Sequence, residues 1–248
     1  MSLSRIKSLF SFQMFHMILK ESRRFSYYWL GLLIFSACSN PFGAGADVYE
    51  TAYIRSNGSG RFEIAIDLNK ARKFINIARY FNRDPAACTQ TTVHKAFRKT
   101  AKRLKRVPGI KKIATARDAN MLNFKLSFEF SSIKALNRAM RKIDAHVDQQ
   151  RLTYFKMNSR SFVRIDTRSI TKLIAYLQSH DDSSVTSFDL ETFFKNSTYQ
   201  FAYSFDKTIK RTTNKLASIT SNRKTVILKQ HIFDEQERRL SFSNKVVF

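Results

Sequence analysis

The sequence predicts an α+β fold, in which antiparallel, hairpin-linked strands form one or two sheets and helices pack on one face of them. Segments with alternating apolar and polar residues occur in pairs around short polar turns, which is typical of β-hairpins. Between these pairs, apolar residues recur at the spacing of one helical face. Because the 248 residues include only 6 Gly and 3 Pro, we expect packed units without long flexible linkers.

The first predicted hairpin joins residues 48–55 to residues 61–67, which both alternate apolar and polar residues. The turn between them, residues 56–60, contains two glycines that can supply the positive φ that a tight hairpin turn demands. The apolar residues of 69–81 share one face of a predicted helix, and Asp84-Pro85 ends it.

A second helix is predicted from about Thr89 to Arg106, and it carries one apolar stripe. The stripe consists of Val93, Phe97, Ala101 and Leu104. The rest of the helix is cationic, and no Asp or Glu occurs from residue 85 to residue 117. Its candidate anion-binding residues are Lys95, Arg98, Lys99, Lys102, Arg103, Lys105 and Arg106. Such a face also keeps a core-packed helix soluble, so the pattern leaves two interpretations open.

The order of hairpin and helix then repeats along the chain. Strands are predicted at 110–117 and 121–130, and Ser131 can cap the helix that follows, whose apolar stripe runs from Ile133 to Val147. The remaining predicted elements are strands at 152–157, 161–166, 199–205, 225–232 and 239–247, a helix at 168–178, and a helix at 206–216 capped by Asp206.

A weak internal similarity suggests that one structural unit is duplicated. The segment from Phe128 to Asn137 is similar to the segment from Tyr203 to Asn214, with one inserted residue before the Ile-Lys pair and one after it. Both predict a strand followed by a helix. We therefore expect two similar strand-helix-hairpin units, one over residues 48–150 and one over residues 151–248, which share a core.

An export signal is predicted ahead of these units. Residues 25–36 form an apolar run of twelve, shorter than the ~20 residues that a membrane-spanning helix needs. Basic residues precede this run, and the small residues Ser36 and Ala37 end the segment. This order is typical of a cleaved signal peptide over residues 1–37, and a start at Met17 would give it a more usual length.

The segment Ile34-Phe35-Ser36-Ala37-Cys38 resembles the lipobox of bacterial lipoproteins, in which an aliphatic residue, a variable residue and two small residues precede a cysteine. Phe35 departs from the leucine that the family favours three places before the cysteine. In that family the thiol receives a diacylglycerol, the leader is cut off before the cysteine, and the new amino terminus is acylated, typically by palmitate. The resemblance implies lipid attachment at Cys38.

Residues 38–47 follow as a small, nearly uncharged and flexible tether. Ser39 stands where some lipoproteins carry an aspartate that retains them in the inner membrane, and this favours the outer membrane. The alternatives are a transmembrane anchor and an ordinary buried first helix in which Cys38 has no special role.

The charge points to anionic partners. Lys and Arg number 44 against 19 Asp and Glu, a formal net charge of +25, and removal of residues 1–37 leaves +21. Such a balance favours binding to nucleic acid, phospholipid headgroups or acidic polymers. With Cys38 lipidated, Cys88 is the last cysteine, so the sequence predicts no intramolecular disulfide and no cysteine-rich zinc site.

We find no motif that predicts catalysis. His94, His146, His180 and His231 lack the i, i+4 spacing to a second histidine that helical zinc sites use. The sequence contains no nucleophile elbow, no phosphate-cradling loop and no dinucleotide fingerprint, so we expect neither an enzyme nor a metal or cofactor site. The predicted function is a lipid-anchored protein of the bacterial cell envelope whose basic α+β domain binds a protein, a lipid or an anionic polymer. Nucleic-acid binding through the helix at 89–106 is the alternative, which export disfavours.

Overall fold

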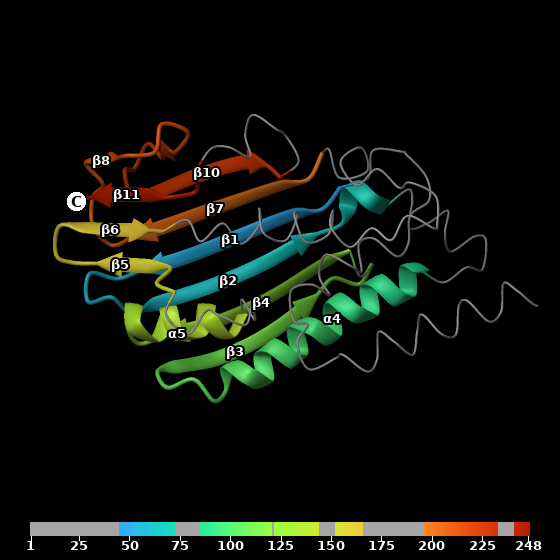
Figure 1. Cartoon of the computed structure of the whole chain (residues 1–248). Coiled ribbons are helices and arrows are strands. Elements are labelled where there is room, and N and C mark those ends of the chain that lie inside the picture. The colour runs from blue at the N-terminus through green and yellow to red at the C-terminus, as the bar shows by residue number, and fades with distance from the viewer. Residues whose placement is uncertain (1–44, 73–84, 121, 144–151, 166–195, 233–240) are drawn as a thin grey trace, which may run out of the picture.

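The structure, a computed structural model, describes residues 45–72, 85–120, 122–143, 152–165, 196–232 and 241–248. These residues form two β-sheets and two α-helices (Figure 1). The signal peptide, Cys38, His146, His180 and the helix expected at 168–178 lie outside the described residues, as do the side chains of Cys88 and Val93. The predicted α+β class, with sheets built largely from antiparallel hairpins, is confirmed; helices packed on one shared face stay a prediction.

The larger sheet has seven strands in the order β3-β4-β2-β1-β7-β10-β9. Their bounds are β1 (Asp47–Ile54), β2 (Gly60–Asp67), β3 (Ile110–Arg117), β4 (Asn123–Phe130), β7 (Thr198–Phe205), β9 (Ser218–Ile219) and β10 (Thr225–His231). The smaller sheet has the order β5-β6-β11-β8, with β5 (Phe155–Met157), β6 (Ser161–Arg164), β8 (Arg211–Thr212) and β11 (Asn244–Val247). The helices are α4 (Pro85–Leu104) and α5 (Ile133–Ile143), and a 3-10 turn, η1, covers Asn69–Ala71.

The first hairpin forms as its pattern predicts. β1 and β2 pair antiparallel from Asp47 opposite Asp67 to Ile54 opposite Gly60. Gly58 supplies the positive φ, at 78°. Gly60 serves a different purpose, because a Cβ there would lie 2.0 Å from the Tyr53 carbonyl oxygen. The second hairpin, β3 with β4, is also confirmed.

The prediction of an antiparallel sheet is wrong at one pair of strands. β1 and β7 run parallel, from Val48 opposite Tyr199 to Ile54 opposite Phe205. Alternation of apolar and polar residues is the same in parallel and antiparallel strands, so the pattern could not distinguish them. The pairing also places strands from before and after residue 151 in one sheet, so the expected units 48–150 and 151–248 contribute to a common sheet.

The helix expected at 206–216 is wrong, so the strand-helix similarity that suggested a duplicated unit has no counterpart in the structure there. Residues 206–216 form a loop that contains β8. The Asp206 carboxylate does not cap a helix there, because it accepts hydrogen bonds from the Ser56 amide (2.8 Å) and hydroxyl (3.0 Å). Ile209 is fully buried, and its amide donates to the Arg223 carbonyl (2.7 Å). Contacts with distant segments therefore replace the local helix.

The cap of α5 also differs from the prediction by one residue. The Ser132 hydroxyl, and not that of Ser131, accepts the hydrogen bond from the Ala135 amide (3.2 Å). The Ser131 amide donates to the Gly109 carbonyl (2.9 Å), so that residue belongs to the loop preceding the helix. Once started, α5 buries Leu136, Ala139 and other residues of its apolar stripe.

Aromatic rings join the two sheets into one core. Phe162 of β6 contacts Tyr203 and Phe205 of β7, with ring centroids 5.7 Å and 5.3 Å apart. Phe155 of β5 contacts Phe62 of β2, at 6.4 Å. All of these side chains are at least nine-tenths buried. Aromatic pairs stabilise a core by roughly 0.5–1.5 kcal/mol beyond the burial of their area, so this layer holds the sheets together.

The strands define two ends of the larger sheet. The Asp47 end holds Asp47, where the described chain begins close by at Gly45. The Ile54 end holds Ile54, Phe205 and Thr225, along with the turns next to them. α4 contacts β3 and β4, and its last residue, Leu104, is followed by a short turn into β3 at the Ile54 end (Figure 1).

Candidate anion-binding surface

The basic residues of α4 form an exposed surface along one side of the molecule. Lys95, Arg98, Lys99, Lys102, Lys105 and Arg106 are exposed, and Arg103 is half-buried. The opposite side of the helix is packed, since Phe97 and Leu104 are 6% and 0% exposed. The predicted amphipathic helix is thus present, with its cations facing solvent.

No carboxylate in the part of the chain that the structure describes neutralises the charges of this surface. Among the described residues, no ion pair involves any of the seven basic side chains. From Lys95 to its end at Leu104, two residues before the predicted end, the helix rises about 14 Å, so its cations form a line, and Lys105 and Arg106 follow in the turn after it. A line of unpaired cations fits an extended anion, such as a chain of phosphate or carboxylate groups, through electrostatic contacts that salt weakens.

Lysines of the neighbouring edge strand have a different explanation. Lys111 and Lys112 lie on β3, where the pairing with β4 shifts register, and Lys112 has a positive φ of 48°. Lys112 also pairs with Glu129 at 3.1 Å. Charges and a bulge on an edge strand prevent it from pairing with another chain. We therefore keep the candidate surface to α4.

A second group of charged residues is buried between the two sheets, and the sequence analysis did not find it. The guanidinium of Arg164 on β6 lies 3.3 Å from the Glu50 carboxylate on β1, and their side chains are only 14% and 3% exposed. The same guanidinium donates to the hydroxyls of Tyr203 (2.9 Å) and Tyr199 (3.1 Å). Both hydroxyls donate to Glu50, so the carboxylate is fully occupied.

Rings enclose this ion pair. The Arg164 guanidinium lies over the rings of Tyr199, Phe201 and Phe242, with centroids between 5.1 Å and 5.7 Å away. Burial alone would lower the pKa of Arg164. The Tyr203 hydroxyl and the Glu50 carboxylate act in the opposite direction and outweigh burial, so the pKa lies above its usual value. Burial and the same carboxylate raise the pKa of both tyrosine hydroxyls, so they remain protonated donors. The group is closed and internally satisfied, which indicates a structural role.

A signal for this buried pair exists in the sequence. Glu50 occupies an inward position of an alternating strand, between Val48 and Ala52, and Arg164 follows the buried Phe162 by two residues. A charged residue at an inward, otherwise apolar position of a strand predicts that a residue of opposite charge is buried beside it. Which residue that partner is could not be deduced, because the two lie 114 residues apart.

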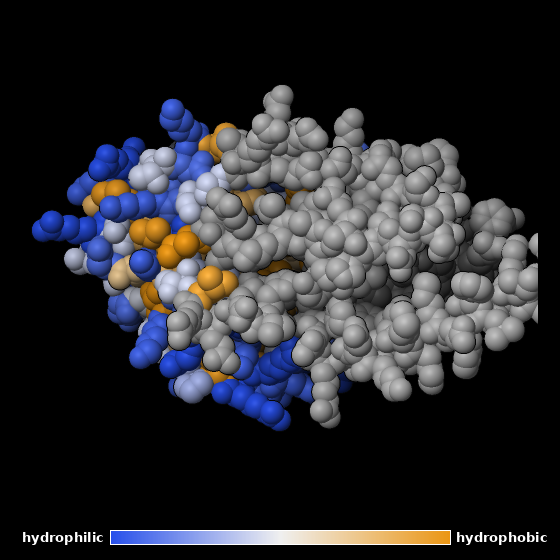
Figure 2. Space-filling view, in the orientation of Figure 1, coloured by the Kyte–Doolittle hydropathy of each residue, from blue (hydrophilic) through white to orange (hydrophobic). Residues whose placement is uncertain are grey.

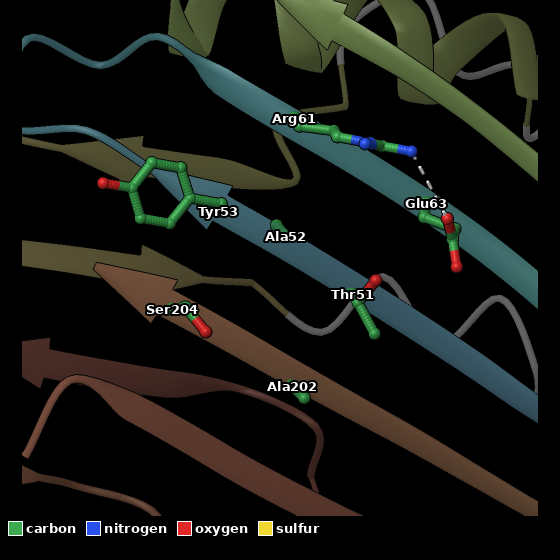
Figure 3. Close-up of a pocket in the computed structure, with 7 residues that line it drawn as sticks. All are labelled: Thr51, Ala52, Tyr53, Arg61, Glu63, Ala202 and Ser204. Carbon is green, nitrogen blue, oxygen red and sulfur yellow. Dashed lines mark ion pairs between the residues drawn. The ribbon is translucent and has the colours of Figure 1, made fainter. Parts of the chain in front are cut away.

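The outer face of the larger sheet carries a hollow of about 270 Å³ (Figure 3). Thr51 and Tyr53 of β1, Arg61 and Glu63 of β2, and the small residues Ala202 and Ser204 of β7 surround it. Glu63 lies 3.9 Å from Arg61 and 3.4 Å from Lys125, so its charge is compensated. The lining holds no histidine, cysteine or paired carboxylates, and it offers no nucleophile with a neighbouring base.

Within the described ranges, no three His, Cys, Asp or Glu side chains lie close enough together to hold a metal ion. None of the helices in those ranges is both long and apolar enough to cross a membrane.

The described residues thus define an α+β protein with two sheets, a closed core and a basic helical surface. No protein-family model matches the chain, and no curated protein matches it. Among solved structures, the chain is similar to the NMR structure of the folded domain of the LppM protein of Mycobacterium tuberculosis. The match has 8% sequence identity and a TM-score of 0.39, and covers 85% of this chain and 93% of the other. A similarity this low carries no argument about function.

Proposed function

We propose that the chain is a non-enzymatic lipoprotein of the bacterial cell envelope, whose α+β domain binds an anionic partner through the basic surface of α4. The observation that carries the proposal is the line of exposed cations on α4, which no carboxylate of the described residues neutralises. The like charges in this line repel one another, which costs electrostatic free energy, and an anionic partner would offset that repulsion. The partner is an anionic polymer, a lipid or an acidic protein.

The anchoring part of the proposal rests on the sequence around Cys38. The apolar run, the small residues before the cysteine and the tether after it support lipidation, and they favour a domain held at the outer membrane. Two acyl chains on one residue give stable attachment, whereas a single chain binds only marginally. The domain itself would then need no membrane-crossing segment.

Replacing the lipidated cysteine tests the anchor. Cys38→Ala is expected to abolish labelling by a clickable palmitate analogue and to leave an uncleaved precursor, whereas Cys88→Ala keeps the label and the mature size. The measurement is in-gel fluorescence of cells that express each variant, with globomycin-treated wild-type cells as a second reference. Equal labelling of wild type and Cys38→Ala would disprove lipidation at this site.

Charge neutralisation on α4 tests the binding surface. We expect Lys95→Gln/Lys99→Gln/Lys102→Gln to elute from a heparin column at a clearly lower salt concentration than wild type. The reason is that the variant lacks three positive charges that attract the anionic heparin. The matched control is Lys134→Gln/Lys142→Gln/Lys156→Gln, which removes three exposed lysines outside α4. Equal shifts for both variants would show that only net charge matters and that α4 is not a specific surface.

Nucleic-acid binding is the second candidate, because the same line of cations fits a phosphodiester backbone. It predicts that single-stranded DNA binds more tightly than heparin at equal charge, with an affinity that falls steeply with salt. A comparison of both ligands by fluorescence anisotropy over a salt series separates the two candidates.

A further inference from the structure

The Ile54 end of the molecule carries a second basic surface, separate from α4. Four turns meet there, covering residues 55–59, 158–160, 206–211 and 221–224. Their basic residues are Arg55, Arg160, Lys207, Lys210, Arg211, Arg223 and Lys224, and Asp206 is their one acidic residue. In the space-filling view, hydrophilic side chains line the margin of this end (Figure 2). We call these seven residues the end surface.

Hydrogen bonds fix the four turns relative to one another. Asp206 holds the Ser56 amide and hydroxyl, which joins the first turn to the third. The Lys207 ammonium donates to the Ser159 carbonyl (2.8 Å), which joins the third turn to the second. The Arg223 guanidinium donates to the Ile209 carbonyl (2.9 Å), which joins the third turn to the fourth. The end surface is therefore ordered before any partner arrives, which lowers the entropic cost of binding.

Two of these cations fix the turns through hydrogen bonds, and four others are exposed and open to a partner. Lys207 and Arg223 have the structural hydrogen bonds just described. Arg160, Lys210, Arg211 and Lys224 are exposed, and no carboxylate of the described residues pairs with their side chains. Asp206, the one acidic residue of these four turns, is already occupied by Ser56.

The end surface is broad, whereas the α4 surface is a line. The four turns come from both sheets, which pack about 10 Å apart, and from strands spaced about 4.8 Å apart within each sheet. Cations spread over an area match a plane of headgroups better than they match a single polymer chain. A phospholipid bilayer with anionic headgroups is such a plane, and each basic residue near it strengthens binding about fivefold.

The end surface also lies opposite the point where the tether enters. The described chain begins at Gly45, beside Asp47, at the other end of the eight-residue strand β1. Strand β1 alone spans about 26 Å, and the residues from 38 to 44 reach at most about 25 Å when fully extended. A domain tethered through Cys38 would thus present the end surface away from the membrane that holds the lipid.

We propose that the end surface docks onto an anionic phospholipid bilayer other than the one in which the lipid of Cys38 is inserted, so that the protein bridges two membrane surfaces. The orientation rests on the proposed lipid anchor. The docking itself rests on the four exposed cations, the fixed turns and the spread of the charges over both sheets.

Vesicle capture tests the proposal. The mature lipidated chain is reconstituted into phosphatidylcholine donor vesicles, and labelled acceptor vesicles with or without 30% phosphatidylglycerol are added at about physiological salt. Capture of acceptors on the donors is measured by two-colour fluorescence cross-correlation. We expect capture only of acceptors that contain phosphatidylglycerol, and its loss when salt is raised severalfold.

Matched variants locate the docking surface. Arg160→Gln/Lys210→Gln/Arg211→Gln/Lys224→Gln is expected to weaken capture by roughly 100-fold or more. Lys95→Gln/Arg98→Gln/Lys99→Gln/Lys102→Gln removes the same charge from α4 and is expected to change capture less than about fivefold. Urea midpoints of both variants should equal that of wild type, because all eight side chains are exposed. Equal losses in the two variants, or capture of acceptors without phosphatidylglycerol, would overturn the proposal.

The outcomes separate docking from anchoring. If the chain fails to stay with donor vesicles but floats directly with phosphatidylglycerol vesicles, and the end-surface variant does not, docking stands while the lipid anchor fails. If the chain stays on the donors but binds only soluble heparin and never an acceptor vesicle, the anchor stands and docking is wrong.

Discussion

Arginine has opposite surroundings in two regions of this protein. Arg164 is enclosed by three aromatic rings, a carboxylate and two tyrosine hydroxyls, whereas Arg98 and its neighbours on α4 face water. In the first region every donor has a partner within the fold, so the charge positions one sheet against the other. In the second region the fold does not use the charge, and a partner outside the domain is free to use it. Between these two regions, burial and not residue type separates a cation that the fold uses from cations that are open to a partner.

Breaking the buried pair has the largest expected effect. Glu50→Leu leaves the Arg164 guanidinium buried without its counter-charge, and we expect the free energy of unfolding to fall by about 3–5 kcal/mol. Urea denaturation followed by circular dichroism measures it. Glu129→Leu, which removes the 42% exposed partner of Lys112, is the control and should cost less than about 1 kcal/mol. Equal losses would show that burial does not matter at Arg164.

Removing both charges sharpens the same comparison. Because desolvation offsets much of the attraction within a buried pair, Glu50→Leu/Arg164→Met is expected to regain more than half of the stability that Glu50→Leu loses. The same denaturation series provides the double-mutant cycle. A double variant no more stable than Glu50→Leu would mean that Arg164 contributes mainly through its packing on the rings.

An uncharged buried contact provides an intermediate case. Asn137 of α5 accepts hydrogen bonds from the amides of Tyr154 (2.7 Å) and Phe155 (2.9 Å) and donates to the Phe155 carbonyl (2.8 Å). Asn137→Ala leaves these backbone groups unsatisfied, and we expect a loss of about 1–3 kcal/mol in urea denaturation. Asn222→Ala, at an exposed turn, is the control. An unchanged midpoint for Asn137→Ala would mean that water replaces the side chain.

Acid should remove the smaller stability that a half-buried carboxylate, Asp118, contributes. Burial acts to raise the pKa of Asp118, but hydrogen bonds from Asn123 and Leu122 lower it more, so the pKa lies below its usual value. A carboxylate with a depressed folded-state pKa contributes stability above the unfolded value, and that stability is lost as pH falls through the folded one. Wild type should lose more stability than Asp118→Asn when pH drops from 6 to 3. Parallel pH profiles in urea would contradict this.

The exposed α4 cations should have the smallest effect on stability. Neutralising Lys95, Lys99 and Lys102 is expected to change the free energy of unfolding by less than about 0.5 kcal/mol per residue, since none has an ion pair within the described residues. Thermal denaturation measures this, and it must accompany the heparin experiment. A large loss would assign these lysines a structural role, as for Arg164.

Local features of the fold were predictable from the sequence, and distant pairings were not. The hairpins at β1–β2 and β3–β4 depend on alternation and on a turn, which are both contained in a short segment. The parallel pairing of β1 with β7 depends on a partner about 150 residues away. Asp206 and Ile209 look like the start of a helix, but their contacts with Ser56 and Arg223 decide their conformation.

The candidate site shows the same division. The cationic side of α4 follows from helical spacing within one segment, so its exposed residues were predicted correctly. The end surface consists of four short turns, each with one to three basic residues, and no single segment of the sequence displays it. The Arg164–Glu50 pair was indicated by a charge at an inward strand position, but its partner depends on the packing of two sheets.

The position of β7 beside the central strand β1 has a consequence for how the protein is made. β1 has β2 as one neighbour and acquires its other only when residues 198–205 have been synthesised, and β8 and β11 of the smaller sheet follow later still. Pairings over such distances form slowly, because a long loop must close before they stabilise anything. The larger sheet would therefore be completed only when the last fifth of the chain emerges from the ribosome, and the proposed export would benefit from this delay, because a translocation channel accepts an unfolded chain.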